Sequence, residues 1–179
     1  MDFSAEYEAH VEAIADLFTA TFTNSEGSEE GALIGELARR LMAETPLQDI
    51  RVFTVWNDNE LGGAIIFSRL TFKGDSSSVF VLGPVAVATE HQRQHIGQRL
   101  IAHGLQGLRQ EGVDLAVTYG NPSFYRRVGF SVITEDDVPA PFSLQHPEGW
   151  LGQSLNNTPL TPLKGPSRCV QAFNDPAFW

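Results

Sequence analysis

Sulfur-containing residues and long hydrophobic runs are scarce in this sequence. Its 179 residues include one cysteine, Cys169, and two methionines. A single cysteine excludes an internal disulfide and a zinc centre of several thiolates, so we expect Cys169 to be a buried bystander. No stretch approaches the roughly 18 uninterrupted apolar residues of a membrane span. The first residues, MDFSAEYEAHVEAIADLF, carry acids where a secretory signal carries Lys or Arg. We therefore expect a soluble, cytoplasmic protein that binds no membrane.

Positive charge is also in short supply. Twelve Lys and Arg residues stand against 22 Asp and Glu residues, which gives a formal net charge of -10. Because phosphate contacts need a basic face, this balance argues against a general nucleic-acid binder. The bases are unevenly spread, however: residues 91–127 hold five arginines against two acids. This local excess is either an ordinary mixed surface or a site for a phosphorylated ligand.

Several widespread nucleotide and nucleophile motifs are missing. The sequence has no Walker A loop, no G-x-G-x-x-G and no G-x-S-x-G elbow. With 42% hydrophobic residues the chain can fill a core, and its length fits one domain over residues 1–179. Function must therefore be sought in other patterns.

Apolar residues at three- and four-residue spacings predict two N-terminal helices. One covers residues 7–22, and the second has its apolar stripe at 34–42. The acidic, glycine-containing stretch 23–31 is predicted to be a loop between them. Three of its acids either attract a cationic amine or keep the loop soluble: Glu26, Glu29 and Glu30.

The middle of the chain predicts strands. Residues 51–56, 61–72 and 79–87 favour an antiparallel meander. Pro84 has no N–H for the ladder, so we expect a missing neighbour, a bulge or an opening of the sheet there. A helix from about Gln94 to Gly112, followed by a strand at 113–119, favours a parallel crossover. Later strands are predicted at 130–133 and 167–173.

The stretch ATEHQRQHIGQRL, residues 88–100, is unusually rich in hydrogen-bond donors. Its histidines His91 and His95, with His103 beyond them, could bind zinc if all three lined one helix face. A helix start near Gln94 leaves His91 in the preceding loop, however, so its side chain would point elsewhere. We therefore favour solvated or capping histidines over a metal site.

An anion site needs fewer assumptions. A strand that passes directly into a helix leaves the first helical amides unpaired, and with the helix dipole they form a phosphate seat. Gln92 and Arg93 would add side-chain donors, and Gly97 would allow close approach of a ligand. A purely structural explanation stays open, since polar residues commonly begin a helix and Gly97 also permits close packing.

Two segments carry a family resemblance. LGPVAVATEHQRQHIGQRLI resembles the acyl-CoA signature of the GNAT superfamily of N-acyltransferases, a strand followed by Q/R-x-x-G-x-G/A. Gln92 and Gly97 match its first and last positions, whereas His95 replaces its first glycine. YGNPSFYRRVGF resembles the family pattern N-x-x-x-x-Y-x-x-x-G-F with one spacer residue missing. This phrase and the end VQAFNDPAFW are similar to the bacterial YhbS-like branch.

The resemblance implies both a fold and a cofactor. The fold is α/β (α+β), with a mixed, mostly antiparallel central sheet of six to seven strands flanked by helices. Its acyl-CoA-binding core is 79–130, and the Pro-rich segment 138–179 packs on it. Acetyl-CoA or coenzyme A is the implied co-substrate, with its pantetheine arm in the gap where the strand at 79–87 splays from the strand at 113–119. The implied cofactor contacts are Val85, Ala86, Val87, Gln92, Arg93, Gln94, His95, Ile96, Gly97, Gln98, Arg99, Asn121 and Phe124.

The implied reaction moves an acetyl (acyl) group to a primary amine of a small molecule or protein by direct attack in a ternary complex. Tyr125 is the implied catalytic residue, because a phenol with a pKa of about 10 is protonated at neutral pH and can donate to a departing thiolate. Packing of a short helix is the other role for Tyr125, and an N-cap is the other role for Asn121. The general base stays unplaced: Glu90 lies near the signature, and a water relay would leave no residue to find.

Two further functions remain open, as does the oligomeric state. His95 in a glycine position keeps open a catalytically silent module that binds or senses acyl-CoA. A histidine metal-binding protein is the third alternative, although we predict no metal. The expected partners are acyl-CoA and an amine acceptor, without nucleic acid or membrane, and a homodimer is among the possible assemblies.

Overall fold

Four α-helices and eight strands make up the chain, which the computed structural model describes from Met1 to Trp179. They are β1 (Asp2–Ser4), α1 (Val11–Glu26), α2 (Ser28–Glu44), β2 (Ile50–Asn57), β3 (Glu60–Phe72), β4 (Asp75–Val87), α3 (Ile96–Gln110), β5 (Leu115–Tyr119), α4 (Pro122–Tyr125), β6 (Ser131–Val132), β7 (Trp150–Ser154) and β8 (Ser167–Arg168). No helix combines the length and the apolar character needed to cross a membrane.

The strands form one mixed, mostly antiparallel sheet in the order β1-β2-β3-β4-β5-β7-β6, with β8 paired to β3. This confirms the predicted fold class. The sheet has eight strands instead of six to seven, because β1 and β7 were not predicted. Of the strand predicted at 167–173, only Ser167 and Arg168 pair, and a 3-10 helix follows at Gln171–Phe173.

The chain divides into two units. The first contains Met1–Phe67 and Gly83–Gly104, and the second contains Ser68–Leu82 and Leu105–Trp179. The elements β3, β4 and α3 begin in one unit and end in the other. The prediction of a single domain over 1–179 stays a prediction.

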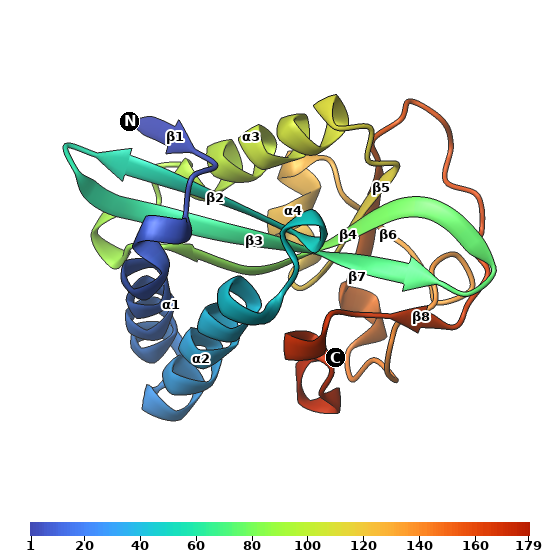
Figure 1. The fold of residues 1–179 in the computed structure, drawn as a ribbon, viewed down its shortest axis with the longest axis horizontal. Coiled ribbons are helices and arrows are strands. Elements are labelled where there is room, and N and C mark those ends of the chain that lie inside the picture. Colours follow the sequence, from blue (N-terminus) through green and yellow to red (C-terminus); the bar gives the residue numbers. More distant parts are fainter. The chain divides into compact units, whose positions relative to one another are not determined.

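In the first unit, α1 and α2 lie side by side below the strands in Figure 1. The loop predicted at 23–31 is wrong: α1 runs to Glu26, α2 begins at Ser28, and only Gly27 (φ 101°) separates them. The two helices approach closely because α2 presents glycines to α1. A Cβ atom added at Gly35 would lie 1.8 Å from the Thr19 Oγ1. The acids of the predicted loop are therefore on helix ends.

The other strands and helix of the first unit follow the predicted pattern. Asp58 (φ 47°) and Asn59 (φ 70°) form the two-residue turn of the predicted β2–β3 hairpin. The first turns of α3 lie on the opposite face of β2 and β3 from α1 and α2 (Figure 1). There, a Cβ atom added at Gly104 would lie 2.9 Å from the Phe67 ring and 3.1 Å from the Phe53 ring. Gly104 therefore allows α3 to pack tightly on the strands.

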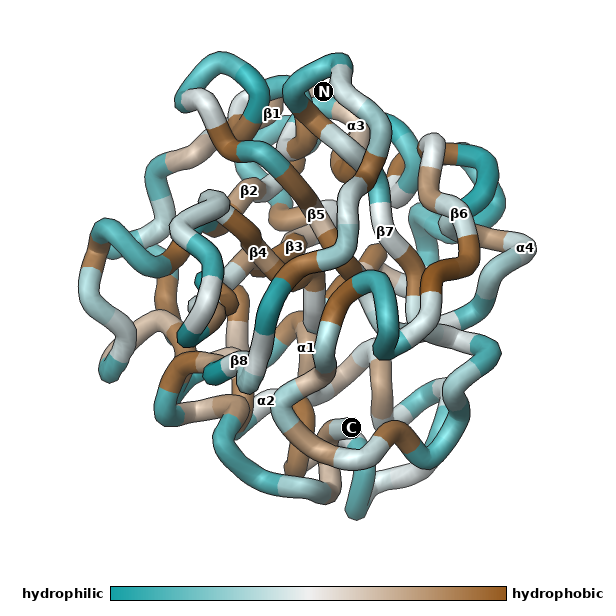
Figure 2. The backbone as a smooth tube through the Cα atoms, turned by 90° about the vertical axis from the view of Figure 1, so that its right-hand side faces the viewer, coloured by the Kyte–Doolittle hydropathy of each residue, from teal (hydrophilic) through white to brown (hydrophobic).

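The second unit contains the predicted parallel pair of strands. β4 and β5 pair from Val79↔Leu115 to Leu82↔Thr118, where the ladder ends, two residues before Pro84. This agrees with the expectation that pairing fails near that proline. Figure 2 shows hydrophobic residues along β5 and hydrophilic residues in the surrounding loops.

The unpredicted strand β7 pairs with both β5 and β6. Its first residue, Trp150, is fully buried, and the indole N–H donates to the Val138 carbonyl at 2.9 Å. The C-terminal Trp179 is also buried, with its ring centroid 6.1 Å from that of Trp150. The Pro-rich region therefore contributes core aromatics to the second unit.

Candidate functional site

The turn between β4 and α3 lies in the first unit and carries most of the predicted cofactor contacts. A 3-10 turn at Thr89–His91 follows β4, and α3 begins at Ile96, two residues later than predicted. Between them Arg93 (φ 64°) and His95 (φ 60°) adopt left-handed backbone conformations. Such a conformation costs a non-glycine residue about 1–2 kcal/mol, and histidine tolerates it better than most. His95 thus keeps the backbone geometry for which the family signature has glycine.

The backbone amides of residues 93–98, in the last part of this turn and the first residues of α3, have no acceptor within the protein. The Arg99 amide bonds to the His95 carbonyl at 3.1 Å, and no such bond exists for residues 93–98. The side chains of Gln92, Arg93, Gln94 and His95 around them are exposed. Unpaired amides at the positive end of a 15-residue helix are the donors that an anion requires. The turn therefore offers unpaired hydrogen-bond donors to an anion.

Hydrogen bonds to the Val87 carbonyl hold this turn against β4 and α1. The Gln92 side-chain amide donates to it at 3.1 Å, and the Thr21 hydroxyl of α1 donates at 3.5 Å. Asn24, one turn further along α1, donates to the Thr89 hydroxyl at 3.0 Å. Gln92, predicted to lie near phosphates, therefore has its side chain directed to the strand. The sequence pattern did not reveal Thr21 or Asn24, because both lie in α1, far from the turn in sequence.

The predicted contacts in β4 differ in the direction of their backbone groups. The Ala88 amide donates to the Gly62 carbonyl of β3 at 2.9 Å, and the Ala86 carbonyl lies 3.1 Å from a Cβ atom added at Gly63. Because these groups alternate along an antiparallel strand, those of Val85 and Val87 point away from β3. Val85 and Val87 therefore have backbone groups facing the free edge, whereas Ala86 contributes a small buried side chain.

The remaining side chains around the turn have varied surroundings. Ile96 and Gly97 are buried, and Gln98 is half-buried. The Arg99 guanidinium lies 5.7 Å from the centre of the Phe3 ring in β1, whereas Arg93 is exposed. His103 stacks on Phe3 at 4.9 Å. No group of three or more His, Cys, Asp or Glu side chains could hold a metal ion.

Three predicted residues lie together in the second unit, on α4. Asn121 caps this helix: its side-chain oxygen accepts from the Ser123 amide at 2.9 Å, and Pro122 begins the helix. The predicted N-cap is thereby confirmed. Phe124 is half-buried, and its ring meets that of Tyr125 edge to face with centroids 5.0 Å apart.

Tyr125 sits in a close-fitting environment. Its ring meets the buried Phe130 at 5.8 Å, and a Cβ atom added at Gly120 would lie only 2.8 Å from the Tyr125 Cε2. The neighbouring Thr118 hydroxyl donates to the Leu82 carbonyl at 2.9 Å. Burial raises the pKa of Tyr125 above its ordinary value of 10.0, and the neighbouring Thr118 hydroxyl opposes this rise. The phenol is therefore protonated at neutral pH.

Sequence reasoning missed Thr118 and Gly120 as neighbours of Tyr125. A threonine in the otherwise apolar strand VDLAVTY was the available signal, since a buried hydroxyl needs a partner. Cys169 is half-buried, and burial raises the pKa of its thiol to about 11, so it is not a thiolate at neutral pH.

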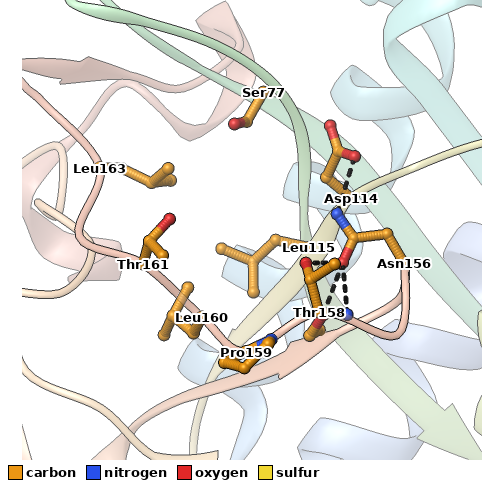
Figure 3. Close-up of a pocket in the computed structure, with 10 residues that line it drawn as sticks. Ser77, Asp114, Leu115, Asn156, Thr158, Pro159, Leu160, Thr161 and Leu163 are labelled. Atoms are coloured by element: carbon orange, nitrogen blue, oxygen red, sulfur yellow. Dashed lines mark hydrogen bonds between the residues drawn. The ribbon is translucent and has the colours of Figure 1, made fainter.

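A pocket in the second unit lies at the amino ends of β4 and β5 and contains none of the predicted residues (Figure 3). Asp114 accepts from the Ser78 amide at 2.8 Å and from the Asn156 side chain at 3.1 Å. Asn156 in turn accepts from Thr158 and from Ser154. The polar groups of Asp114, Asn156, Ser154 and Thr158 therefore form a hydrogen-bonded network at this pocket.

A sequence model of the acetyltransferase (GNAT) domain matches residues 4–133. The chain belongs to the GNAT acetyltransferase family. It is 39% identical over 113 residues to the uncharacterized N-acetyltransferase YjhQ of Escherichia coli K12, and 27% identical over 82 residues to the uncharacterized N-acetyltransferase YhbS of the same strain. These matches cover 60% and 46% of this GNAT chain, and 62% and 49% of the relatives' own lengths.

Solved GNAT structures share the fold. The crystal structure of E. coli YhbS in complex with CoA aligns with a TM-score of 0.78 at 20% identity, over 97% of this chain and 92% of that one. A GNAT acetyltransferase from Brucella melitensis in complex with acetyl-CoA aligns with a TM-score of 0.71 at 24% identity, over 96% and 97% of the two chains. The predicted similarity to the YhbS-like branch is confirmed.

Proposed function

We propose that this GNAT protein transfers an acetyl group from acetyl-CoA to a primary amine of a small molecule or protein. The observation that carries the proposal is the row of unpaired amides at residues 93–98, which stands where the family signature binds the cofactor pyrophosphate. YhbS and the Brucella protein hold CoA and acetyl-CoA, respectively. Acetyl-CoA is accordingly the co-substrate to test first.

The residues around the turn have distinct roles in binding. The amides of 93–98 receive the pyrophosphate, and the exposed side chains of Arg93 and His95 add donors beside them. Gln92 supports the turn through its bond to the Val87 carbonyl. The outward backbone groups of Val85 and the outward amide of Val87 pair with the amide-containing pantetheine arm, as they would with another strand.

Tyr125 acts as the general acid. An amine attacks as the free base, the C–N bond forms as the C–S bond breaks, and the departing sulfur takes a proton from the Tyr125 phenol. The phenol regains a proton through water from the attacking nitrogen, so protons balance over one turnover. Because burial raises the pKa of Tyr125 above 10.0, this acid is protonated throughout the neutral range.

Thermal unfolding with acetyl-CoA, free CoA or zinc tests binding. A ligand at about one hundred times its Kd stabilises the folded state by about 2.7 kcal/mol, or roughly 5–10 °C in Tm for a chain of this size. We expect a shift with both CoA species and none with zinc. Unchanged Tm values with acetyl-CoA and CoA would contradict the proposed function.

Thiol release over a panel of primary amines then tests turnover. We expect amine-dependent release in the wild type and at least a tenfold lower kcat, as a rough minimum for a lost general acid, in Tyr125→Phe. Tyr7→Phe is the control, since Tyr7 is buried and its hydroxyl has no partner. Binding without release for any amine would favour a sensor of acyl-CoA over an enzyme.

A further inference from the structure

We propose that Thr21 and Asn24 of α1 are positioning residues for acetyl-CoA: they hold the turn between β4 and α3 in the conformation that binds the cofactor, so that α1 contributes to binding through this turn. The inference rests on the proposed function, because it concerns the amides of residues 93–98 as the pyrophosphate site. All the residues that carry it lie in the first unit.

Thr21 contacts the end of β4 instead of its own helix. A threonine inside a helix commonly donates to the carbonyl four residues earlier, and Thr19 donates in this way to Ala15 at 3.0 Å. The buried Thr21 hydroxyl instead donates to the Val87 carbonyl at 3.5 Å, and that carbonyl also accepts from the Gln92 side-chain amide at 3.1 Å. The two donors occupy both lone pairs of the Val87 carbonyl. α1 and the turn are thereby joined at one acceptor.

Asn24 supplies a second contact on the same face of α1. Residues three apart lie side by side on a helix, so the side chains of Thr21 and Asn24 point the same way. The Asn24 side chain donates to the Thr89 hydroxyl at 3.0 Å, in the first residue of the 3-10 turn. α1 therefore contacts both the last residue of β4 and the residue two positions later. Two contacts fix the orientation of the turn, whereas one would leave it free to pivot.

The turn needs such support from outside. The amides of residues 93–98 have no acceptor within the protein, so the part that would receive the pyrophosphate is not held by bonds from its own amides. Arg93 and His95 adopt left-handed conformations, which other arrangements of the turn would avoid. A site that is formed only part of the time has its affinity reduced by that fraction. Contacts that keep the turn in place before acetyl-CoA binds therefore increase the affinity for acetyl-CoA.

Substitutions at both ends of the Asn24–Thr89 bond test the inference. Asn24→Ala removes the donor and introduces a better helix former, so α1 itself is not weakened. Thr89→Val removes the acceptor, whereas Thr89→Ser keeps it. For the loss of one hydrogen bond, we expect the Kd for CoA to rise about twofold to tenfold in Asn24→Ala and in Thr89→Val, and to stay near the wild-type value in Thr89→Ser. The double variant should bind CoA no more weakly than either single variant, because both remove the same bond.

Steady-state kinetics separate binding from chemistry. Thr21→Val keeps the shape of the buried side chain but has no hydroxyl. We expect Thr21→Val and Asn24→Ala to raise the KM for acetyl-CoA severalfold and to leave kcat near the wild-type value, as for residues that act in binding alone. Asp16→Ala is the control, since Asp16 is exposed and lies about two turns earlier in α1. It should change neither parameter.

Amide hydrogen exchange, measured by NMR, reports on the turn without any cofactor. The His91 amide donates to the Ala88 carbonyl at 2.8 Å, within the turn. We expect this amide to exchange faster in ligand-free Asn24→Ala than in the wild type, because the turn opens more often when its contact with α1 is lost. In Thr89→Ser the exchange rate should stay near the wild-type value.

The outcomes distinguish the inference from the proposed function. Wild-type affinity for CoA in both Asn24→Ala and Thr89→Val would overturn the role of α1 while leaving the acetyltransferase intact. Equal losses in Thr89→Val and Thr89→Ser, or losses that multiply in the double variant, would do the same. An unchanged exchange rate of the His91 amide in Asn24→Ala would overturn it without reference to binding. Absence of CoA binding in the wild type would instead contradict the proposed function, and with it the role of α1 in binding.

Discussion

Gly120→Ala tests whether the position of the Tyr125 ring matters for catalysis. The added Cβ atom would lie 2.8 Å from the Tyr125 Cε2, whereas ordinary contact begins at 3.4 Å, so the ring must retreat by about 0.6 Å. Its other sides are limited by Phe124 and Phe130. The retreat therefore displaces the Tyr125 hydroxyl from its position in the wild type.

The loss in free energy of unfolding that we expect for Gly120→Ala follows from overpacking. Extra volume in a tight site destabilises by about 1–3 kcal/mol, and the lower chain entropy of Ala in the unfolded state returns about 0.4–1 kcal/mol. We therefore expect a net loss of about 1–2 kcal/mol, which lowers Tm by roughly 2–8 °C. Because a misplacement of about 1 Å can cost a hundredfold in rate, we expect kcat to fall at least about tenfold.

Thermal unfolding and amine-dependent thiol release measure the two effects. Gly62→Ala is the matched control, since its added Cβ atom would meet nothing closer than 3.5 Å. In a Tyr125→Ala background, Gly120→Ala should be neutral or slightly stabilising because the ring is gone. Two results would contradict a clash between the added Cβ atom and the Tyr125 ring. One is equal destabilisation by Gly120→Ala in the wild type and in the Tyr125→Ala background, and the other is an unchanged kcat in the Gly120→Ala variant.

Three further substitutions test other parts of the structure by thermal unfolding. His95→Gly should raise Tm by about 1–4 °C, since relief of a left-handed conformation outweighs the added chain entropy; a lower Tm would contradict strain at this position. Gly35→Ala should destabilise by about 3 kcal/mol or more, because its Cβ atom would lie 1.8 Å from the Thr19 Oγ1, and Thr19→Ala should restore most of the loss if this contact is responsible. Asn121→Ala should cost about 1 kcal/mol through loss of the N-cap, whereas Asn121→Asp should retain it; equal losses in both would argue against capping.

The sequence predicted the fold class because its strongest signals are periodic. The hydrophobic stripes located α1, α2 and α3, and the Asn-Asp-Asn turn located the hairpin. The loop at 23–31 was wrong because a single glycine at position 27 breaks the helix, and the glycines that follow serve the contact between α1 and α2. Glycine in a helix contact is indistinguishable from glycine in a loop without knowledge of the partner.

The missed strands lack a periodic signal of their own. β1 has three residues, and β7 begins after Pro147 and contains Gly152, features that are typical of loops. β7 is held by pairing with β5 and β6 and by burial of Trp150, which are tertiary effects.

The candidate site could be predicted where one short segment carries it. The backbone amides of the turn at 88–99 lie within one short stretch of the sequence, so a motif could locate this turn. Thr21 and Asn24 could not be predicted, since they reach the turn from a helix more than sixty residues earlier in the chain. The close contacts of the Tyr125 ring with Gly120 and Phe130 likewise arise only in the folded chain.

Amine-dependent thiol release from acetyl-CoA, measured together with the acetylated product over a panel of primary amines, tests the central claim most directly. The account predicts that at least one amine yields thiol and acetylated amine in equal amounts, and that Tyr125→Phe slows both alike while Tyr7→Phe does not. Tight binding of acetyl-CoA with no amine-dependent release, or equal rates in wild type and Tyr125→Phe, would contradict it.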